Sequence, residues 1–177
     1  MYVPFRAFGA VSIAGAATFA VPALAQPLGS DSAACTAGNQ PAILANIHGM
    51  KDRAGRIKIE IYPDNEDDFL KRDDDLIAEN KVFRRVWADP PQSGPVSICI
   101  RVPRPGRYAV VFTHQRESKK KFNVWVDGVG LPSDRRIGRS RPKVDQALVN
   151  VGPSVLRTDI TVQYIRGLRG FAPARAN

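Results

Sequence analysis

The chain has 177 residues, 44% of them hydrophobic and 24% charged, with 26 basic and 17 acidic side chains and a net charge of +9. This apolar content excludes a disordered chain, and the length suits one domain rather than several. The positive charge favours anionic partners.

The first 25 residues have the pattern of a cleavable export signal. Arg6 precedes an apolar run from Ala7 to Val21, and small residues at Ala23 and Ala25 suit cleavage after Ala25. The run is shorter than the roughly 20 residues that span a bilayer, and no second apolar run follows, so no transmembrane segment is predicted. We therefore predict a signal peptide over residues 1–25 and a periplasmic or secreted location, where nucleic acid is not an expected partner.

The two cysteines, Cys35 and Cys99, both follow the predicted signal. In an oxidising compartment such a pair is most simply a disulfide, which here would tether an N-terminal segment, residues 26–41, to the domain that follows. Cys99 lies between Ile98 and Ile100, so strand alternation predicts that it points away from the apolar face and that the segment crosses the outside of the sheet. A lipid-anchored Cys35 is the rival interpretation, because two alanines precede it. Ser32 counts against lipidation, since a leucine-like residue is expected at that position.

From residue 42 to 168 the chain consists of short alternating apolar and polar runs, separated by Gly, Pro and Asp, which is typical of antiparallel strands. In the clearest run Ile57, Ile59 and Ile61 share one face, so we expect that face to be buried and the other to be wet. The expected strands lie near residues 43–47, 56–62, 81–87, 96–102, 107–113, 121–126, 147–151 and 156–164. Together they predict an all-β fold, a single antiparallel β-sandwich of the Ig-like or prealbumin-like kind, with about seven or eight strands.

Two stretches lack this alternation. Residues 64–75 hold seven acids against Lys71 and Arg72, and we expect a solvated loop there with one short helix near residues 66–71. The stretch lacks the glycine and terminal glutamate of a helix–loop–helix calcium site, and weak surface cation binding is the alternative to a plain loop. Residues 169–177, rich in Arg, Gly, Pro and Ala, are expected to form a disordered tail.

Several motifs follow one another after a tight turn at Pro105 and Gly106. They are His114, Lys120-Lys121-Phe122, Asp127-Gly128-Val129-Gly130, Gly138-Arg139-Ser140-Arg141-Pro142-Lys143 and Tyr164-Ile165-Arg166-Gly167-Leu168. In this combination, residues 35–168 resemble the bacterial domain of unknown function 2141 family. The resemblance implies an exported Ig-like β-sandwich with no established activity. Many members carry an acidic loop after the strand histidine that could hold a cation such as Ca²⁺, whereas residues 115–121 here are basic, so no such site is expected.

The basic stretch from residue 116 to 143 is the candidate binding surface. Its candidate ligand-binding residues are Arg116, Lys119, Lys120, Lys121, Trp125, Arg135, Arg136, Arg139, Arg141 and Lys143. Arginine forks suit phosphate and carboxylate groups, and a neighbouring aromatic ring can stack on a sugar. The expected partners are an anionic glycan, a lipid headgroup or an acidic protein of the cell envelope. A solubilising loop that binds no ligand is the competing interpretation.

No catalytic motif is found. His48 and His114 are the only histidines and lack the spacing of metal ligands, so no metal or other cofactor is predicted and His114 is expected to be a hydrogen-bonded structural residue. No serine lies in a Gly-x-Ser-x-Gly turn, and no free thiol would survive the predicted disulfide. The sequence thus predicts a non-catalytic, exported domain that binds through its basic loop. A hydrolase acting on an envelope polymer and a purely structural envelope domain are the alternatives.

Overall fold

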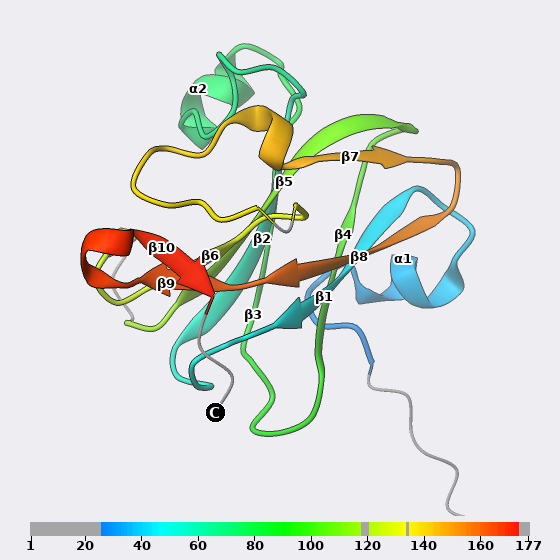
Figure 1. The fold of residues 1–177 in the computed structure, drawn as a ribbon. Helices are drawn as coiled ribbons and strands as arrows, with labels where there is room; N and C mark the ends of the chain where they lie inside the picture. Colours follow the sequence, from blue (N-terminus) through cyan, green and yellow to red (C-terminus); the bar gives the residue numbers. More distant parts are fainter. Residues whose placement is uncertain (1–25, 118–120, 134, 174–177) are drawn as a thin grey trace, which may run out of the picture.

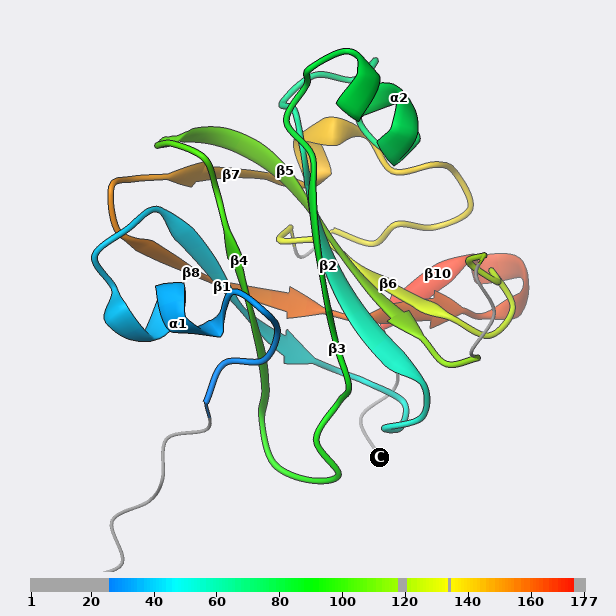
Figure 2. The same ribbon diagram turned by 180° about the vertical axis from the view of Figure 1, so that it is seen from behind.

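The computed structural model describes residues 26–117, 121–133 and 135–173, so the predicted signal peptide lies outside the described residues. Two β-sheets face each other (Figures 1 and 2). The smaller has the order β4-β1-β8, with β1 (Ala42–His48), β4 (Val96–Arg101) and β8 (Val155–Thr161).

The larger, seven-stranded sheet has the order β10-β9-β6-β5-β2-β3, with β7 paired to β5. Its strands are β2 (Arg56–Tyr62), β3 (Arg84–Ala88), β5 (Gly106–Gln115), β6 (Gly128–Gly130), β7 (Leu148–Val151), β9 (Gln163–Ile165) and β10 (Phe171–Pro173). Short helices α1 (Ser32–Ala37) and α2 (Asp73–Ala78) and the 3-10 turns η1 (Val144–Gln146) and η2 (Gly167–Arg169) lie outside the sheets. None of the helices in the described part of the chain has the length and apolar character needed to span a membrane.

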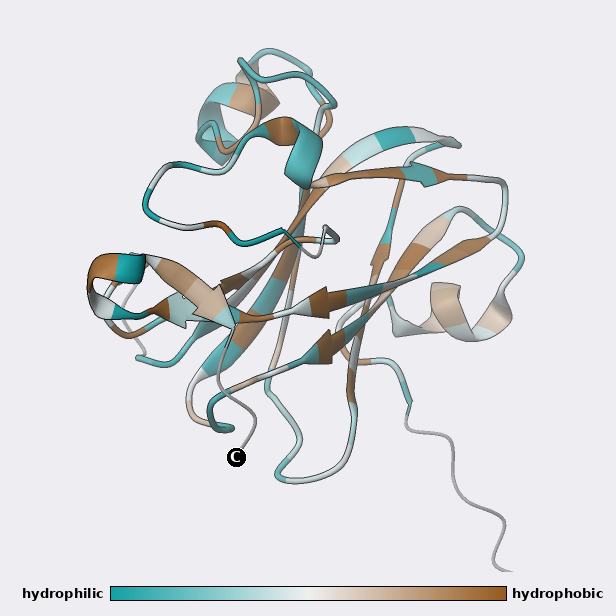
Figure 3. Cartoon of the chain, in the orientation of Figure 1, coloured by the Kyte–Doolittle hydropathy of each residue, from teal (hydrophilic) through white to brown (hydrophobic). Residues whose placement is uncertain are grey.

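The main core lies between the two sheets, because alternate residues of each strand point inward. Ile57 and Ile59 of the larger sheet meet Ile43, Ile98 and Ile160 of the smaller one, and all five are fully buried. Figure 3 shows apolar residues along the facing strands and hydrophilic residues concentrated in the connecting loops. The predicted all-β sandwich is confirmed.

A second apolar cluster covers the outer face of the larger sheet. Tyr62 of β2 packs there with Phe69, Leu76 of α2, and Leu131 and Ile137 from the connection between β6 and β7. The prediction that the second face of residues 56–62 is wet is therefore wrong for its C-terminal half. The covering residues are distant in sequence, so the alternation within the strand could not reveal them.

The disulfide predicted between Cys35 and Cys99 is formed, with the two Cα atoms 6.0 Å apart. The flanking residues of Cys99 face the main core, so its own side chain lies on the outer face of the smaller sheet. Helix α1 carries Cys35 and packs on this face with Ala34 beside Leu44. The N-terminal segment is thus pinned to the outside of the sheet, as the strand alternation indicated.

Three strand predictions need correction. Residues 121–126 form a turn instead of a strand, because Asn123 Oδ1 accepts the Trp125 N–H and the backbone carbonyl of Asn123 accepts the N–H groups of residues 126 and 127. The run 156–164 is divided between β8 and β9, which belong to different sheets. Strand β8 also runs parallel to β1, so the sandwich is not purely antiparallel. The described residues form ten strands instead of about eight, because β6 and β10 were not predicted.

Residues 171–173 form β10 instead of the start of a disordered tail; residues 174–177 are not described. Phe171 exchanges backbone hydrogen bonds with Gly138, at N···O distances of 3.0 and 2.6 Å. A Cβ atom on Gly170 would lie 2.2 Å from the Gly138 carbonyl oxygen, so this close approach requires glycine. Strand β10 itself is formed by antiparallel pairing with β9, and the contact with Gly138 adds an isolated bridge from a distant part of the chain.

The acidic stretch also differs from expectation. Its helix is α2, at residues 73–78, and not at 66–71, because three aspartates stabilise the first turn and Leu76 is buried. Asp68 and Phe69 are buried too, so the stretch is not simply a solvated loop. Its acids pair with bases of the same chain, as Asp68 does with Lys81 at 2.5 Å.

The turn at Pro105 and Gly106 joins the two sheets, since β4 belongs to one and β5 to the other. The hydroxyl of Tyr108 donates to the carbonyl oxygen of Arg104 at 2.7 Å. Such a tyrosine corner, with the hydroxyl bonded to the backbone a few residues upstream, is a feature of Ig-like sandwiches. It fixes the direction in which the chain enters β5.

Candidate functional site

The outer face of the larger sheet is crossed by a segment that we call the strap, residues 131–147, of which residue 134 is not described. In both views the strap passes between α2 and the β9–β10 hairpin (Figures 1 and 2). Its backbone is held by Gln163, whose side chain accepts the Ile137 N–H and donates to the Arg135 carbonyl, both at 3.0 Å. Glu66 accepts the Val144 N–H at 2.8 Å near the other end of the strap.

A cleft of about 410 Å³ lies between the strap and the sheet, and we call it the strap cleft. Its apolar lining includes Tyr62, Val111, Val129, Ile137 and Phe171. This volume and largely apolar lining are those of a small-molecule site. The polar or charged residues that line it are Lys58, Glu60, Thr113, Arg139, Ser140 and Arg141.

Glu60 lies on the floor of the strap cleft and is 3% exposed. Its carboxylate accepts hydrogen bonds from Lys58 Nζ at 2.8 Å and from Arg85 Nε at 2.5 Å. Arg85 also donates to Asp73 of α2 at 2.7 Å, so this network ties the helix to the sheet. Burial of a carboxylate requires such partners, and these two cations satisfy its charge.

Two arginines of the strap reach the cleft and differ in how they are held. Arg141 donates to the backbone carbonyl of Phe69. Arg139 has no hydrogen bond or ion pair with any residue that the structure describes. Its guanidinium group, which carries five N–H donors, is therefore available to an anion in the cleft.

The structure brings only part of the predicted binding surface together. Arg139 and Arg141 line the strap cleft, whereas Arg116 is turned toward Asp52. Lys119 and Lys120 lie outside the described residues. The others point elsewhere: Lys121, Trp125 and Lys143 are exposed, Arg135 pairs with Asp145 at 2.8 Å, and Arg136 donates to the Arg169 carbonyl.

Lys58, Glu60 and Arg85 were not among the predicted site residues. The polar positions of the run 56–62 did contain a signal, because Lys58 and Glu60 share the face opposite the buried isoleucines. Only the strap, which approaches from a distant part of the chain, makes that face the floor of a cleft.

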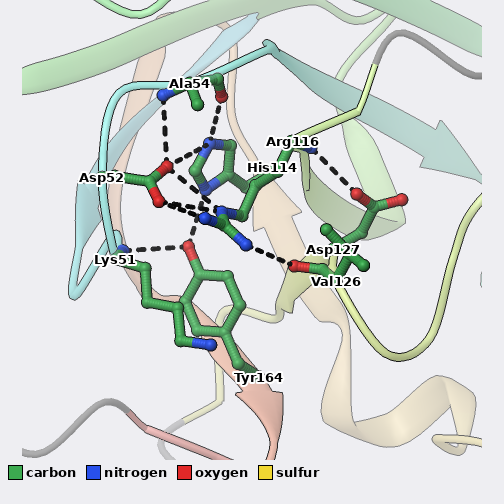
Figure 4. Close-up of polar contacts among 8 residues, drawn as sticks. All are labelled: Lys51, Asp52, Ala54, His114, Arg116, Val126, Asp127 and Tyr164. Carbon is green, nitrogen blue, oxygen red and sulfur yellow. Dashed lines mark hydrogen bonds and ion pairs between the residues drawn. The ribbon is translucent and has the colours of Figure 1, made fainter.

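A buried polar cluster closes the end of the main core and holds the base of the loop between β5 and β6 (Figure 4). The side chain of His114 is fully buried, with Nδ1 2.6 Å from the Tyr164 hydroxyl and Nε2 2.8 Å from the Ala54 carbonyl oxygen. A carbonyl can only accept, so Nε2 carries the proton and Nδ1 accepts the Tyr164 O–H. The tyrosine oxygen in turn accepts the Lys51 N–H at 3.1 Å.

Burial in this cluster lowers the pKa of His114 below its usual 6.5, and burial raises the pKa of Tyr164 to about 12. Both groups are therefore neutral near pH 7. Both ring nitrogens of His114 are engaged inside the protein, so the predicted hydrogen bonding of this histidine is confirmed.

Two aspartates complete the cluster. Asp52 receives two bonds from Arg116, one of them Nε to Oδ2 at 2.9 Å, and this arginine holds the pKa of the Asp52 carboxyl below its usual value. Asp127, 1% exposed, accepts the N–H groups of Arg116 and Asn123 at 2.9 and 2.8 Å. Asp127 thus links the end of β5 to the turn at residues 123–127.

Three of the motifs that carried the family resemblance meet in this cluster, through His114, Asp127 and Tyr164. A Cβ atom on Gly128 would lie 2.6 Å from the Tyr164 ring, so glycine is required beside the histidine–tyrosine pair. His48 lies elsewhere, exposed on β1 and 3.1 Å from Asp159. Within the described residues no three His, Cys, Asp or Glu side chains gather as metal ligands.

Fold and site together define a disulfide-linked β-sandwich with a strap cleft on one outer face. The model of the family described as "Uncharacterized protein conserved in bacteria (DUF2141)" matches residues 45–158, and the chain belongs to this family. No curated protein and no solved structure matches the chain.

Proposed function

We propose that this protein is an exported, non-catalytic binding domain whose strap cleft takes an anionic ligand with an apolar body. The observation that carries the proposal is Arg139, a guanidinium without a described partner at the edge of a largely apolar cleft. An apolar lining suits a hydrocarbon or ring, and the guanidinium suits a phosphate or carboxylate. Among the expected envelope partners, a lipid-like anion fits this combination better than a wholly polar glycan.

The arrangement of the carboxylate supports binding rather than hydrolysis. A glycoside hydrolase needs a pair of carboxyl groups on either side of the bond to be broken. Glu60 is the only carboxylate among the described lining residues, and both of its oxygens are engaged by cations. The disulfide is consistent with an oxidising compartment, which supports the proposed export to the periplasm or beyond.

The test is thermal unfolding with dodecyl phosphate, below its micelle concentration, against dodecyl maltoside and inorganic phosphate. Binding to the folded state raises Tm by mass action. We expect a clear rise with dodecyl phosphate, little with the neutral detergent or with phosphate alone, and a smaller rise for Arg139→Gln. The matched control is Arg135→Gln, because Arg135 pairs with Asp145 and is not part of the cleft lining.

An equal rise in Tm with dodecyl maltoside would contradict the proposal, because the Arg139 guanidinium would then not select the anionic headgroup. No rise with any of the three compounds would overturn the proposal.

A further inference from the structure

A group of exposed apolar side chains lies at one end of the larger sheet, and we call it the aromatic tip. It consists of Phe122, Val124 and Trp125 in the turn before β6 and Leu168 in η2, with exposed fractions of 47%, 39%, 74% and 86%. In both views this turn and η2 lie side by side at the same end of the molecule (Figures 1 and 2). Large apolar side chains gathered in this way on a surface mark an interaction site.

The turn of the tip contacts β10 and has hydrogen bonds of its own. The Phe122 ring stacks on Phe171 of β10, with the ring centroids 6.2 Å apart. The turn is fixed by its own hydrogen bonds, including Asn123 N–H to Asp127 Oδ2 at 2.8 Å. These contacts hold the backbone of the turn that carries Val124 and Trp125, which lowers the entropy cost of burying the two side chains against a partner.

The charge around the tip is positive. Lys121, Arg136 and Arg169 are exposed, and Arg166 is half-buried. Asp127 is the only acid in segments 121–127 and 163–171, and it is 1% exposed with its oxygens bonded to backbone N–H groups. A partner of this surface must accept apolar side chains and offer negative charge.

We propose that the aromatic tip docks on the surface of a bilayer that contains anionic lipid, with Trp125 and Leu168 entering the headgroup region. Tryptophan favours that interface, and basic residues beside it add attraction to anionic lipid. The most exposed apolar residues project from a turn and a short 3-10 segment, which suits insertion between lipids. Phe122 also lines the strap cleft, whereas Trp125 and Leu168 do not, so the proposed docking does not require that the cleft bind a ligand.

The experiment measures Trp125 fluorescence with vesicles of phosphatidylcholine, alone or mixed with phosphatidylglycerol. The chain has two tryptophans, so Trp87→Phe leaves Trp125 as the only emitter. We expect a blue shift with the mixed vesicles, quenching by brominated acyl chains, and weaker binding at high salt. All variants keep the same N-terminus, so any contribution of residues 1–25 is common to them.

Two substitutions at the tip, one of a basic residue beside it and one outside it provide the comparison. Trp125→Ser and Leu168→Ser are each expected to lower the partition coefficient about tenfold. Binding of Trp125→Ser is measured by vesicle sedimentation, because this variant lacks the reporting tryptophan. Arg169→Gln is expected to lower it about fivefold, and only for vesicles with anionic lipid. The matched control is Ile77→Ser on α2, because Ile77 is also a large exposed apolar residue, at 62%, but lies away from the tip.

An unchanged partition coefficient for Ile77→Ser supports the tip as the docking surface. Equal losses for Ile77→Ser and Leu168→Ser would overturn the proposal, because adsorption would then not depend on the tip. Absence of a blue shift and of sedimentation with every vesicle would also overturn it and would leave a protein as the partner of this surface.

Discussion

Loss of the disulfide between Cys35 and Cys99 is expected to lower the free energy of unfolding by about 4 kcal/mol. The two cysteines are 64 residues apart in the sequence. For a loop of this length, the chain-entropy model gives the unfolded chain roughly 14 cal/mol/K of extra entropy, which is about 4 kcal/mol at 25 °C. For a domain of roughly 150 residues this corresponds to a fall in Tm of about 8–16 °C.

The assay is urea denaturation of the oxidised protein with and without a reductant, alongside the double variant Cys35→Ala, Cys99→Ala. Reduction leaves the sulfur atoms in place and therefore measures the loss of the cross-link alone. The double alanine variant also removes the buried sulfur atoms. The dependence of unfolding free energy on urea should become steeper, since the unlinked unfolded chain exposes more surface. A loss below about 1 kcal/mol with an unchanged slope would refute the entropic account. In that case contacts of Asp31 with Arg84 and Arg101 would be what holds the N-terminal segment.

Three further predictions concern single residues. Glu60→Gln should cost about 3 kcal/mol in urea denaturation, because it removes the negative charge that faces two cations; a loss below about 1 kcal/mol would contradict this. His114 has a lowered pKa, so the unfolded state binds more protons below pH 6.5 and stability should fall as the pH drops from that value. His114→Gln should flatten this fall, and an unchanged profile would show that other groups cause it. Tyr108→Phe should cost about 1 kcal/mol through loss of the tyrosine corner, and no change in Tm would count against that bond.

The alternation of apolar residues predicted most of the strands, because it reflects the burial of one face. The inner positions of β2 and β4 are those that the pattern indicated, and the outward direction of Cys99 followed from the same rule. The alternation failed at residues 121–126, where Asn123 and Asp127 bind backbone N–H groups and impose a turn. It also failed at residues 171–173, where antiparallel pairing with β9 creates a strand that has only three residues and therefore shows no alternation.

The candidate site was harder to predict than the fold. Positive charge between residues 116 and 143 drew attention to Arg139 and Arg141, and the structure places both at the strap cleft. It gave equal weight to Arg116, whose charge is used internally by Asp52. Charge along a sequence cannot distinguish these cases, because pairing is decided by residues on other strands. The position of Glu60 opposite the buried isoleucines is visible in the sequence of β2, but only the strap makes that face the floor of a cleft.

The central claim is that the strap cleft binds an anion with an apolar body. The most direct test is calorimetric titration with dodecyl phosphate, comparing the unsubstituted protein with a variant whose cleft is filled by a larger side chain. Val129 lies on β6 in the lining, so Val129→Trp should occupy the space while the sheet is retained. We predict saturable binding to the unsubstituted protein, binding at least about tenfold weaker to Arg139→Gln, and no binding to Val129→Trp. The Tm of Val129→Trp without ligand should stay close to that of the unsubstituted protein. Unchanged binding to a folded Val129→Trp variant would contradict the account, because the ligand would then be bound outside the cleft.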